Sequence, residues 1–141
     1  MIWQAYSDSS YLFYHADRLE SWEGVQQGDP IGPFLFSLGI QHLVEECKSE
    51  FDSWYLDDGT LGGYHVTVLN DLESILKSED YLGLKVNPSK CELHFIDSTL
   101  NEAIIEKFQE LLPNMKIIGP GKSHPTGLAI VRRRNGLCIG N

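Results

Sequence analysis

The sequence predicts an α+β fold in which helices pack on one face of a mainly antiparallel sheet. Three observations lead to this fold class. Short apolar segments with strand-like alternation lie beside turns rich in Gly, Asp and Pro. Longer segments repeat their apolar residues at helical spacing. The strands and hairpin turns are spaced too closely for a doubly wound parallel sheet, whose strands are joined by long crossovers.

Composition is that of one modest globular domain of 141 residues, of which 42% are hydrophobic. No apolar run approaches the roughly 20 residues that span a bilayer, and the first residues lack a secretory signal pattern. We therefore expect an intracellular protein, cytoplasmic or nuclear, with no membrane partner. Cys47, Cys91 and Cys138 form no CxxC pair, which predicts reduced, structural thiols.

Charge is distributed unevenly along the chain, whose net charge is −9. Residues 1–80 carry a balance of −12 and residues 81–141 a balance of +3. The overall acidity argues against the basic surface usual for nucleic-acid binding, but it is compatible with an acidic metal-binding centre. The run Arg132–Arg134 could contact phosphate or form an exposed, solvated tail.

The first half of the chain predicts a hairpin, a loop and a helix. Tyr11–Tyr14 should pair with Trp22–Val25 across a polar connection that contains Asp17, Arg18 and Glu20. Residues 24–33, GVQQGDPIGP, form a loop, after which Asp29 can cap a helix with Pro30 or Pro33 in its first turn. The helix should bury one stripe, formed by Ile31, Phe34, Leu35, Leu38, Leu43, Val44, Cys47 and Phe51.

The second half predicts alternating strands and helices. WYLDDGTLGG, residues 54–63, is a strand, a tight turn at Asp-Gly and a second strand that ends at Gly62–Gly63. A helix over Val66–Lys77 should stop by Gly83. Two extended pieces flank Asn87-Pro88-Ser89, and the second is a half-buried strand with Glu92 and His94 facing outward. A helix over Asn101–Leu112, capped by Thr99 and Glu102, precedes a strand at Met115–Ile118.

Asp57 and Asp58 are the strongest candidates for chemistry, although an Asp-Gly hairpin turn with solvated carboxylates is the simpler interpretation. Mg²⁺ is usually held by one or two carboxylates together with substrate phosphates. Two metal ions about 3.5–4 Å apart can stabilise the attacking and leaving oxygens of phosphoryl transfer. Two like charges this close repel when desolvated, and a cation relieves that repulsion.

Three separated blocks stand out in the sequence. They are GVQQGDPIGPFLFSLGIQHLV, then YLDDGTLGG, which begins 28 residues after Gln27, and then LGLKVNPSKCEL. Together they resemble the palm of reverse transcriptases, especially those of non-LTR retrotransposons. Their order and spacing match the family over roughly residues 21 to 96. The resemblance implies a partial polymerase palm and an RNA-directed DNA polymerase activity. In that reaction a primer 3′-hydroxyl attacks the α-phosphate of a dNTP, with an RNA template, a DNA primer and Mg²⁺ (or Mn²⁺).

The resemblance also implies roles for individual residues. Asp57 would be the direct ligand of both metal ions, and Asp58 would support it. Tyr55 would flank the primer terminus or template. Gln27 and Gly28 would line the nucleotide pocket, although Gln27 could be an ordinary polar loop residue. Lys90 would assist the departure of pyrophosphate, or it could be a solvent-facing strand residue.

The sequence also departs from the family pattern. That pattern has a further metal-binding aspartate several dozen residues before GVQQGDP, whereas only 23 residues precede Gly24, and neither Asp8 nor Asp17 fits. We therefore expect a palm fragment over residues 1–96, inactive alone, with residues 97–141 as a C-terminal extension of the same domain. The alternative is a non-catalytic, truncated α+β remnant that acts at most in protein association. In either case an exposed strand edge predicts self-association.

Overall fold

The computed structural model describes residues 7–21, 24–25, 28–95, 102–119 and 128–133. Its elements, in chain order, are β1 (Ser10–Tyr14), β2 (Asp17–Ser21), α2 (Gly32–Glu46), β3 (Phe51–Tyr55), β4 (Asp58–Tyr64), α3 (His65–Lys77), α4 (Glu79–Leu82), β5 (Cys91–Phe95), α5 (Glu102–Leu111), β6 (Lys116–Ile118) and β7 (Leu128–Arg133). A 3₁₀ turn, Pro88–Lys90, precedes β5. None of the described helices is long and apolar enough to cross a membrane.

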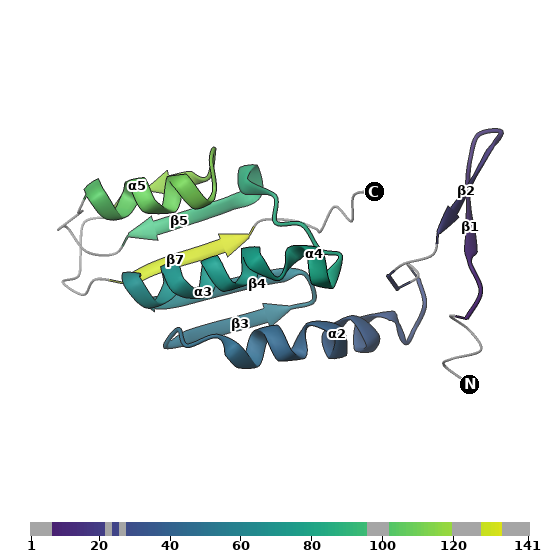
Figure 1. The fold of residues 1–141 in the computed structure, drawn as a ribbon, viewed down its shortest axis with the longest axis horizontal. Coiled ribbons are helices and arrows are strands. Elements are labelled where there is room, and N and C mark those ends of the chain that lie inside the picture. The colour runs from purple at the N-terminus through teal and green to yellow at the C-terminus, as the bar shows by residue number, and fades with distance from the viewer. Residues whose placement is uncertain (1–6, 22–23, 26–27, 96–101, 120–127, 134–141) are drawn as a thin grey trace.

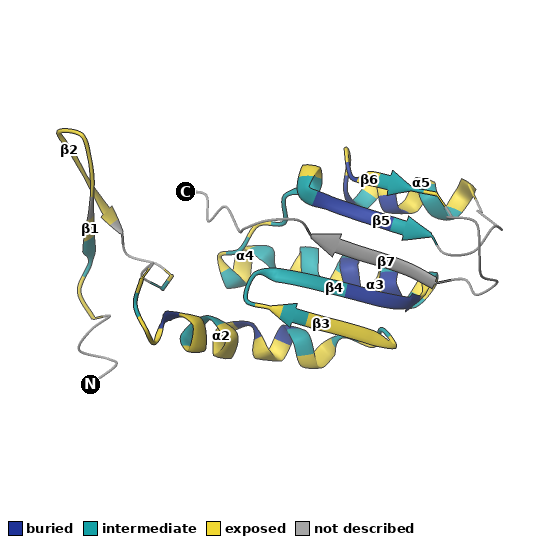
Figure 2. Ribbon diagram, turned by 180° about the vertical axis from the view of Figure 1, so that it is seen from behind, coloured by how far each residue is buried: buried dark blue, intermediate teal, exposed yellow. Residues whose placement is uncertain are grey.

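The predicted α+β class is confirmed. One sheet has the strand order β3-β4-β7-β5-β6, and among its described pairs only β5 and β6 run parallel. Helices α2, α3 and α5 lie on one face of this sheet (Figures 1 and 2), while the other face carries none of the described helices. β1 and β2 form a separate two-stranded sheet. The edge strands of the large sheet are β3 and β6.

The first hairpin corrects one prediction. Its second strand is Asp17–Ser21, so the segment expected to be a polar connection is itself the partner of β1. Trp22 and Glu23, which belong to the strand that was expected instead, lie outside the described residues. A two-residue turn at His15–Ala16, with φ of +55° at His15, sets this register. Arg18 suits a strand here because its guanidinium lies 3.2 Å from the centroid of the Tyr11 ring.

Helix α2 has Pro33 in its first turn as predicted, but its N-cap is Ile31, without a side-chain cap, rather than Asp29, and it buries fewer side chains than expected. Asp29 accepts a hydrogen bond from the backbone N–H of Ile31 at 2.9 Å, and Pro33 occupies the first turn. Ile40 and Leu43 are buried, whereas Phe34 is 60% exposed and Leu38 50% exposed. The predicted stripe is therefore wrong over the first half of the helix, where the described residues leave the apolar side chains exposed.

Three further predicted elements match within one residue. The helix predicted at 66–77 is α3, and Gly83, with φ of +64°, ends the short α4 that follows it. The helix predicted at 101–112 is α5, although Thr99, its predicted cap, lies outside the described residues. The strand predicted at 115–118 is β6. The first of the two extended pieces predicted around Asn87-Pro88-Ser89 is not part of a described strand.

The core lies between the helices and the sheet. Phe108 of α5 and Leu93 of β5 are fully buried, and the Phe108 ring meets Phe95 edge-on at 6.4 Å between centroids. Burying a side chain of this size contributes about 2 kcal/mol. The remaining buried members of this cluster are Leu61, Val68, Leu72, Cys91, Leu112 and Met115. This layer fixes α3 and α5 against the strands that carry the candidate site.

Asp71 joins helix α3 to the connection between α2 and β3. Its carboxylate is 5% exposed and accepts hydrogen bonds from the backbone N–H groups of Lys48, at 2.9 and 3.0 Å, and of Ser49, at 2.7 Å. The Ser49 hydroxyl donates to it as well, at 2.5 Å. Four charge-assisted contacts satisfy a carboxylate that would otherwise be costly to bury. They fix the chain just before β3 begins.

Cys47 stands at the end of α2, close to this carboxylate. Its thiol donates to the backbone oxygen of Leu43 at 3.5 Å. Burial raises the pKa of the Cys47 thiol from 9.0 to about 11, and the nearby negative charges of Asp71 and Asp52 add to this effect. The thiol therefore stays protonated at neutral pH.

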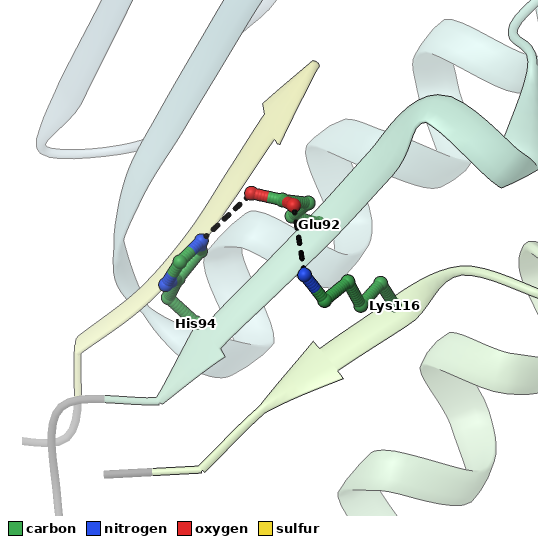
Figure 3. A network of polar contacts seen from close by, with 3 residues as sticks. All are labelled: Glu92, His94 and Lys116. Atoms are coloured by element: carbon green, nitrogen blue, oxygen red, sulfur yellow. Dashed lines mark hydrogen bonds and ion pairs between the residues drawn. The ribbon is translucent and has the colours of Figure 1, made fainter. Parts of the chain in front are cut away.

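Glu92 is a second correction. The strand pattern predicts an outward-facing, solvated side chain, but Glu92 is only 7% exposed. Its carboxylate lies 3.3 Å from His94 Nε2 and 3.4 Å from Lys116 Nζ (Figure 3). Arg132 of β7 is its cross-strand neighbour. His94 of the same strand and Lys116 of the adjacent β6 contact this carboxylate, so alternation along β5 alone could not predict its burial.

We expect Asp71→Ala to lower the free energy of unfolding by about 3 kcal/mol, because it leaves three partly buried donors without their acceptor. Urea denaturation measures the change. Asp80→Ala is the matched control, since Asp80 is an exposed carboxylate. It should cost less than about 0.5 kcal/mol. Equal losses in the two variants would contradict this role for Asp71.

We expect Cys47 to react with iodoacetamide at pH 8 roughly 100-fold more slowly in the folded chain than in the denatured chain, because its raised pKa depletes the thiolate. Peptide mass spectrometry follows alkylation at this one site over time. Similar rates in the folded and denatured chain would show that the thiol is not held in its protonated form.

Candidate active site at the β3–β4 hairpin

The β3–β4 hairpin carries both candidate carboxylates at its end. Tyr55 pairs with Asp58, so the turn consists of Leu56 and Asp57 alone. Leu56 has φ of +53° and Asp57 does not have a positive φ, which is the sign pattern of a type II′ turn. The prediction of a turn at Asp-Gly is therefore wrong by two residues, since Gly59 lies within β4.

Gly59 has a packing role instead. It pairs with Trp54 across the hairpin, and a Cβ atom at position 59 would lie 2.6–2.9 Å from three atoms of the Trp54 ring. Such distances are far shorter than ordinary carbon–carbon contacts. A glycine at this position therefore lets the indole lie directly against the β4 backbone, two residues from the turn.

The carboxylates are half-buried at the end of the sheet. Asp58 Oδ1 is buried and has no hydrogen-bond partner. A buried carboxylate oxygen without a donor is costly, and a bound cation would relieve that cost. The described residues contain no cluster of three or more His, Cys, Asp or Glu side chains that could hold a metal ion. Any cation here would therefore need oxygen ligands from a substrate or from water in addition to the aspartates.

Tyr55 lies beside this pair. It is the cross-strand partner of Asp58 and is 77% exposed. Cross-strand partners share a face of the sheet, and this is the face opposite Trp54 and Gly59, which lie toward the helices. Tyr55 and Asp58 thus share the face of the sheet opposite Trp54 and Gly59. Figure 2 shows this face of the sheet, which carries none of the described helices.

Lys90 lies at the same end of the sheet as Asp58. Thr60, Arg132 and Glu92 align across β4, β7 and β5, which puts β4 and β5 about 10 Å apart. Lys90 precedes Glu92 by two residues, as Asp58 precedes Thr60. A 3₁₀ turn positions Lys90, and Asn87 stabilises that turn by accepting hydrogen bonds from the Ser89 N–H at 3.1 Å and the Ser89 hydroxyl at 2.7 Å.

The predicted nucleotide-pocket residues are only partly described. Gln27 lies outside the described residues. Gly28 is exposed with φ of +89°, and no atom lies within 4 Å of the position that a Cβ would take. The positive φ favours glycine at position 28, and no close contact requires it. The start of α2, which follows this loop, lies toward the same end of the sheet as the β3–β4 turn (Figure 1).

Sequence reasoning missed the strand β7. Arg132 and Arg133 lie within this strand, between β4 and β5, rather than in a solvated tail. Arg134 lies outside the described residues. The apolar run Leu128–Val131 was the signal that could have indicated a strand. The contact between Trp54 and Gly59 gave no such signal, because it depends on the register of the turn.

A sequence model of the family described as reverse transcriptase (RNA-dependent DNA polymerase) matches residues 1–125 of the chain. The match extends beyond residue 96, where the motif resemblance ends. No curated protein and no solved structure matches the chain significantly. The family match covers most of the sequence, including both candidate aspartates, Tyr55 and Lys90. The chain therefore belongs to the reverse transcriptase (RNA-dependent DNA polymerase) family.

Proposed function

We propose that this chain is part of the palm of a non-LTR retrotransposon reverse transcriptase, and that its β3–β4 hairpin serves nucleotidyl transfer from a dNTP to a primer 3′-hydroxyl. The observation that carries the proposal is the buried, unpartnered Oδ1 of Asp58 beside Asp57, at the end of a hairpin within the family match. Residues 1–96 form the palm portion, and residues 97–141 extend the same domain, since β6 and β7 complete its sheet.

Mg²⁺ or Mn²⁺ suits this site chemically. Both aspartates offer hard oxygen ligands, and Mg²⁺ is commonly held by only one or two carboxylates plus substrate phosphates. When bound, such ions neutralise the charge that develops on the reacting phosphate. Asp57 lies in the turn and Asp58 opens β4, so the backbone directs the two carboxylates from adjacent positions.

The neighbouring residues provide substrate contacts in this proposal. Tyr55 offers an exposed ring beside Asp58, where it flanks the primer terminus or template. Gln27 and Gly28 line the nucleotide pocket in the loop before α2. Lys90, at the same end of the sheet, assists the departure of pyrophosphate by charge or by proton donation.

Nucleic acid is the partner of the sheet face that carries Tyr55 and Asp58. Lys116 and His94 line the same face around Glu92, and Arg132 is the cross-strand neighbour of Glu92 (Figure 3). They belong to the part of the chain whose charge balance is positive, in contrast to residues 1–80. Phosphate contacts favour such basic groups. An RNA template, a DNA primer and dNTPs would be used inside the cell, in the cytoplasm or nucleus.

A second candidate function is protein association, and the exposed apolar side chains of α2 favour it. Phe34 and Leu38 lie on a helix that the described residues leave partly uncovered, next to the exposed edge strand β3. Edge strands and apolar patches promote pairing with another chain. Self-association through this edge would accompany the polymerase role or replace it.

We expect the purified chain to bind Mn²⁺ saturably in calorimetry, and Asp57→Asn to weaken that binding at least tenfold, because it removes one of two adjacent charged ligands. Asp52→Asn is the matched control and should bind as the unmodified chain does, since Asp52 is an exposed carboxylate of the same hairpin. Equal binding in all three proteins would mean that the ions bind the acidic surface diffusely and would overturn the proposal.

Light scattering coupled to gel filtration tests the association function. We expect the mass of the chain to rise with concentration, and the double variant Phe34→Ser, Leu38→Ser to stay closer to 15.9 kDa because its apolar contact area is smaller. Tyr81→Ser removes an exposed ring from α4 and is the control. A mass of 15.9 kDa at every concentration, before any substitution, would rule out self-association.

A further inference from the structure

We propose that Trp54 is the positioning residue that holds Asp57 and Asp58 in place, a role that rests on the proposed metal-binding function of these aspartates. Trp54 lies on the helix-facing side of β3, directly opposite the side that carries Tyr55 and Asp58. It would act through the backbone of β4 and would touch neither metal ion nor substrate.

The first support is the contact with β4. The six-membered ring of Trp54 occupies the space that a Cβ on Gly59 would need, with its closest atom 2.6 Å from that position. Gly59 follows Asp58 directly in the chain. The planar indole thus packs directly against the first residues of β4. A movement of Asp58 toward the helices would bring the β4 backbone into steric clash with the ring.

The second support is the unfilled space beside the turn. Two cavities, of about 50 and 330 Å³, flank this region, and Ile40, Trp54 and Leu56 line both of them. Asp57 borders the smaller one. The smaller cavity is also lined by side chains of α2, α3, α4 and residues 84–86. Because the two cavities leave unfilled space beside the indole, the hairpin end would have room to shift if the indole were removed.

The third support is the indole N–H. Trp54 Nε1 is buried and has no hydrogen-bond partner, which is unfavourable. The side chain therefore gains nothing from its donor here. Its stabilising contribution lies in the size and flatness of the ring, so phenylalanine should replace it better than alanine does.

Mn²⁺ affinity measured by calorimetry tests this role, with folded protein verified by circular dichroism. We expect Trp54→Ala to weaken binding about tenfold or more, as loss of a group that orients metal ligands commonly does. Trp54→Phe should retain affinity within about threefold. Phe108→Leu is the control for general destabilisation, because Phe108 is a fully buried core residue that lines neither cavity. It should lower the melting temperature without changing Mn²⁺ affinity.

Gly59→Ala keeps Trp54 and gives an independent test if Trp54→Ala does not fold. The added Cβ must displace the ring or the strand, so Mn²⁺ affinity should fall. The loss should shrink in a Trp54→Leu background, where no ring opposes the methyl group, and this coupling identifies a direct Trp54–Gly59 interaction.

The outcomes separate this inference from the proposed function. If the unmodified chain binds no Mn²⁺, the metal site fails and the positioning role fails with it. If the unmodified chain binds Mn²⁺ but Gly59→Ala and the folded Trp54 variants bind it equally well, the site stands and only the role of Trp54 is overturned. Additive losses from positions 54 and 59 would also overturn it, because they would show that the two residues act separately.

Discussion

The two-residue turn between β3 and β4 is the constraint on which the candidate site depends. Because only Leu56 and Asp57 connect the strands, Tyr55 must oppose Asp58 and Trp54 must oppose Gly59. A shift of one residue would exchange the faces of the sheet and move Asp58 toward the helices. The register therefore determines which side chains face the solvent and which face α2. It also determines the positions of both carboxylates.

Hydrogen bonds and side-chain packing hold the strands of the sheet in place on the side of the helices. Asp71 fixes the connection that leads into β3, α3 packs on the sheet through Val68 and Leu72, and the core around Phe108 supports β5. Ile40 and Leu43, in the second half of α2, are buried and line a cavity with Trp54, while the first half leaves apolar side chains exposed. Close packing thus supports the strands, while two cavities border the hairpin end that carries the carboxylates.

Much of the fold could be predicted from the sequence, because the spacing of apolar residues along a helix or strand indicates which side chains are buried. Helix α3, helix α5 and strand β5 follow apolar patterns, and Gly83 marks the end of α4 through its positive φ. The failures have physical causes. The turns at His15–Ala16 and Leu56–Asp57 place non-glycine residues at positive φ, which turn preferences do not anticipate. Burial of Glu92 depends on contacts with His94 of the same strand and Lys116 of β6.

Some residues of the candidate site could likewise be predicted from the sequence, and others could not. Asp57, Asp58 and Tyr55 were predicted from a motif, and the hairpin brings them together at one end of the sheet. Lys90 reaches that end through the 3₁₀ turn and the alignment of β4, β7 and β5, which sequence order alone does not reveal. Trp54 gave no chemical signal, since its contact with Gly59 exists only in this register.

Paramagnetic broadening of backbone amide signals by Mn²⁺ tests the central claim most directly, because it locates the ion residue by residue. A polymerase-type site at the hairpin end predicts that substoichiometric Mn²⁺ first broadens the signals of residues 55–59, with Lys90 affected next. If broadening instead begins in the acidic stretch Glu45–Asp52, or is uniform over residues 1–80, the two aspartates do not form a metal site and the account is wrong.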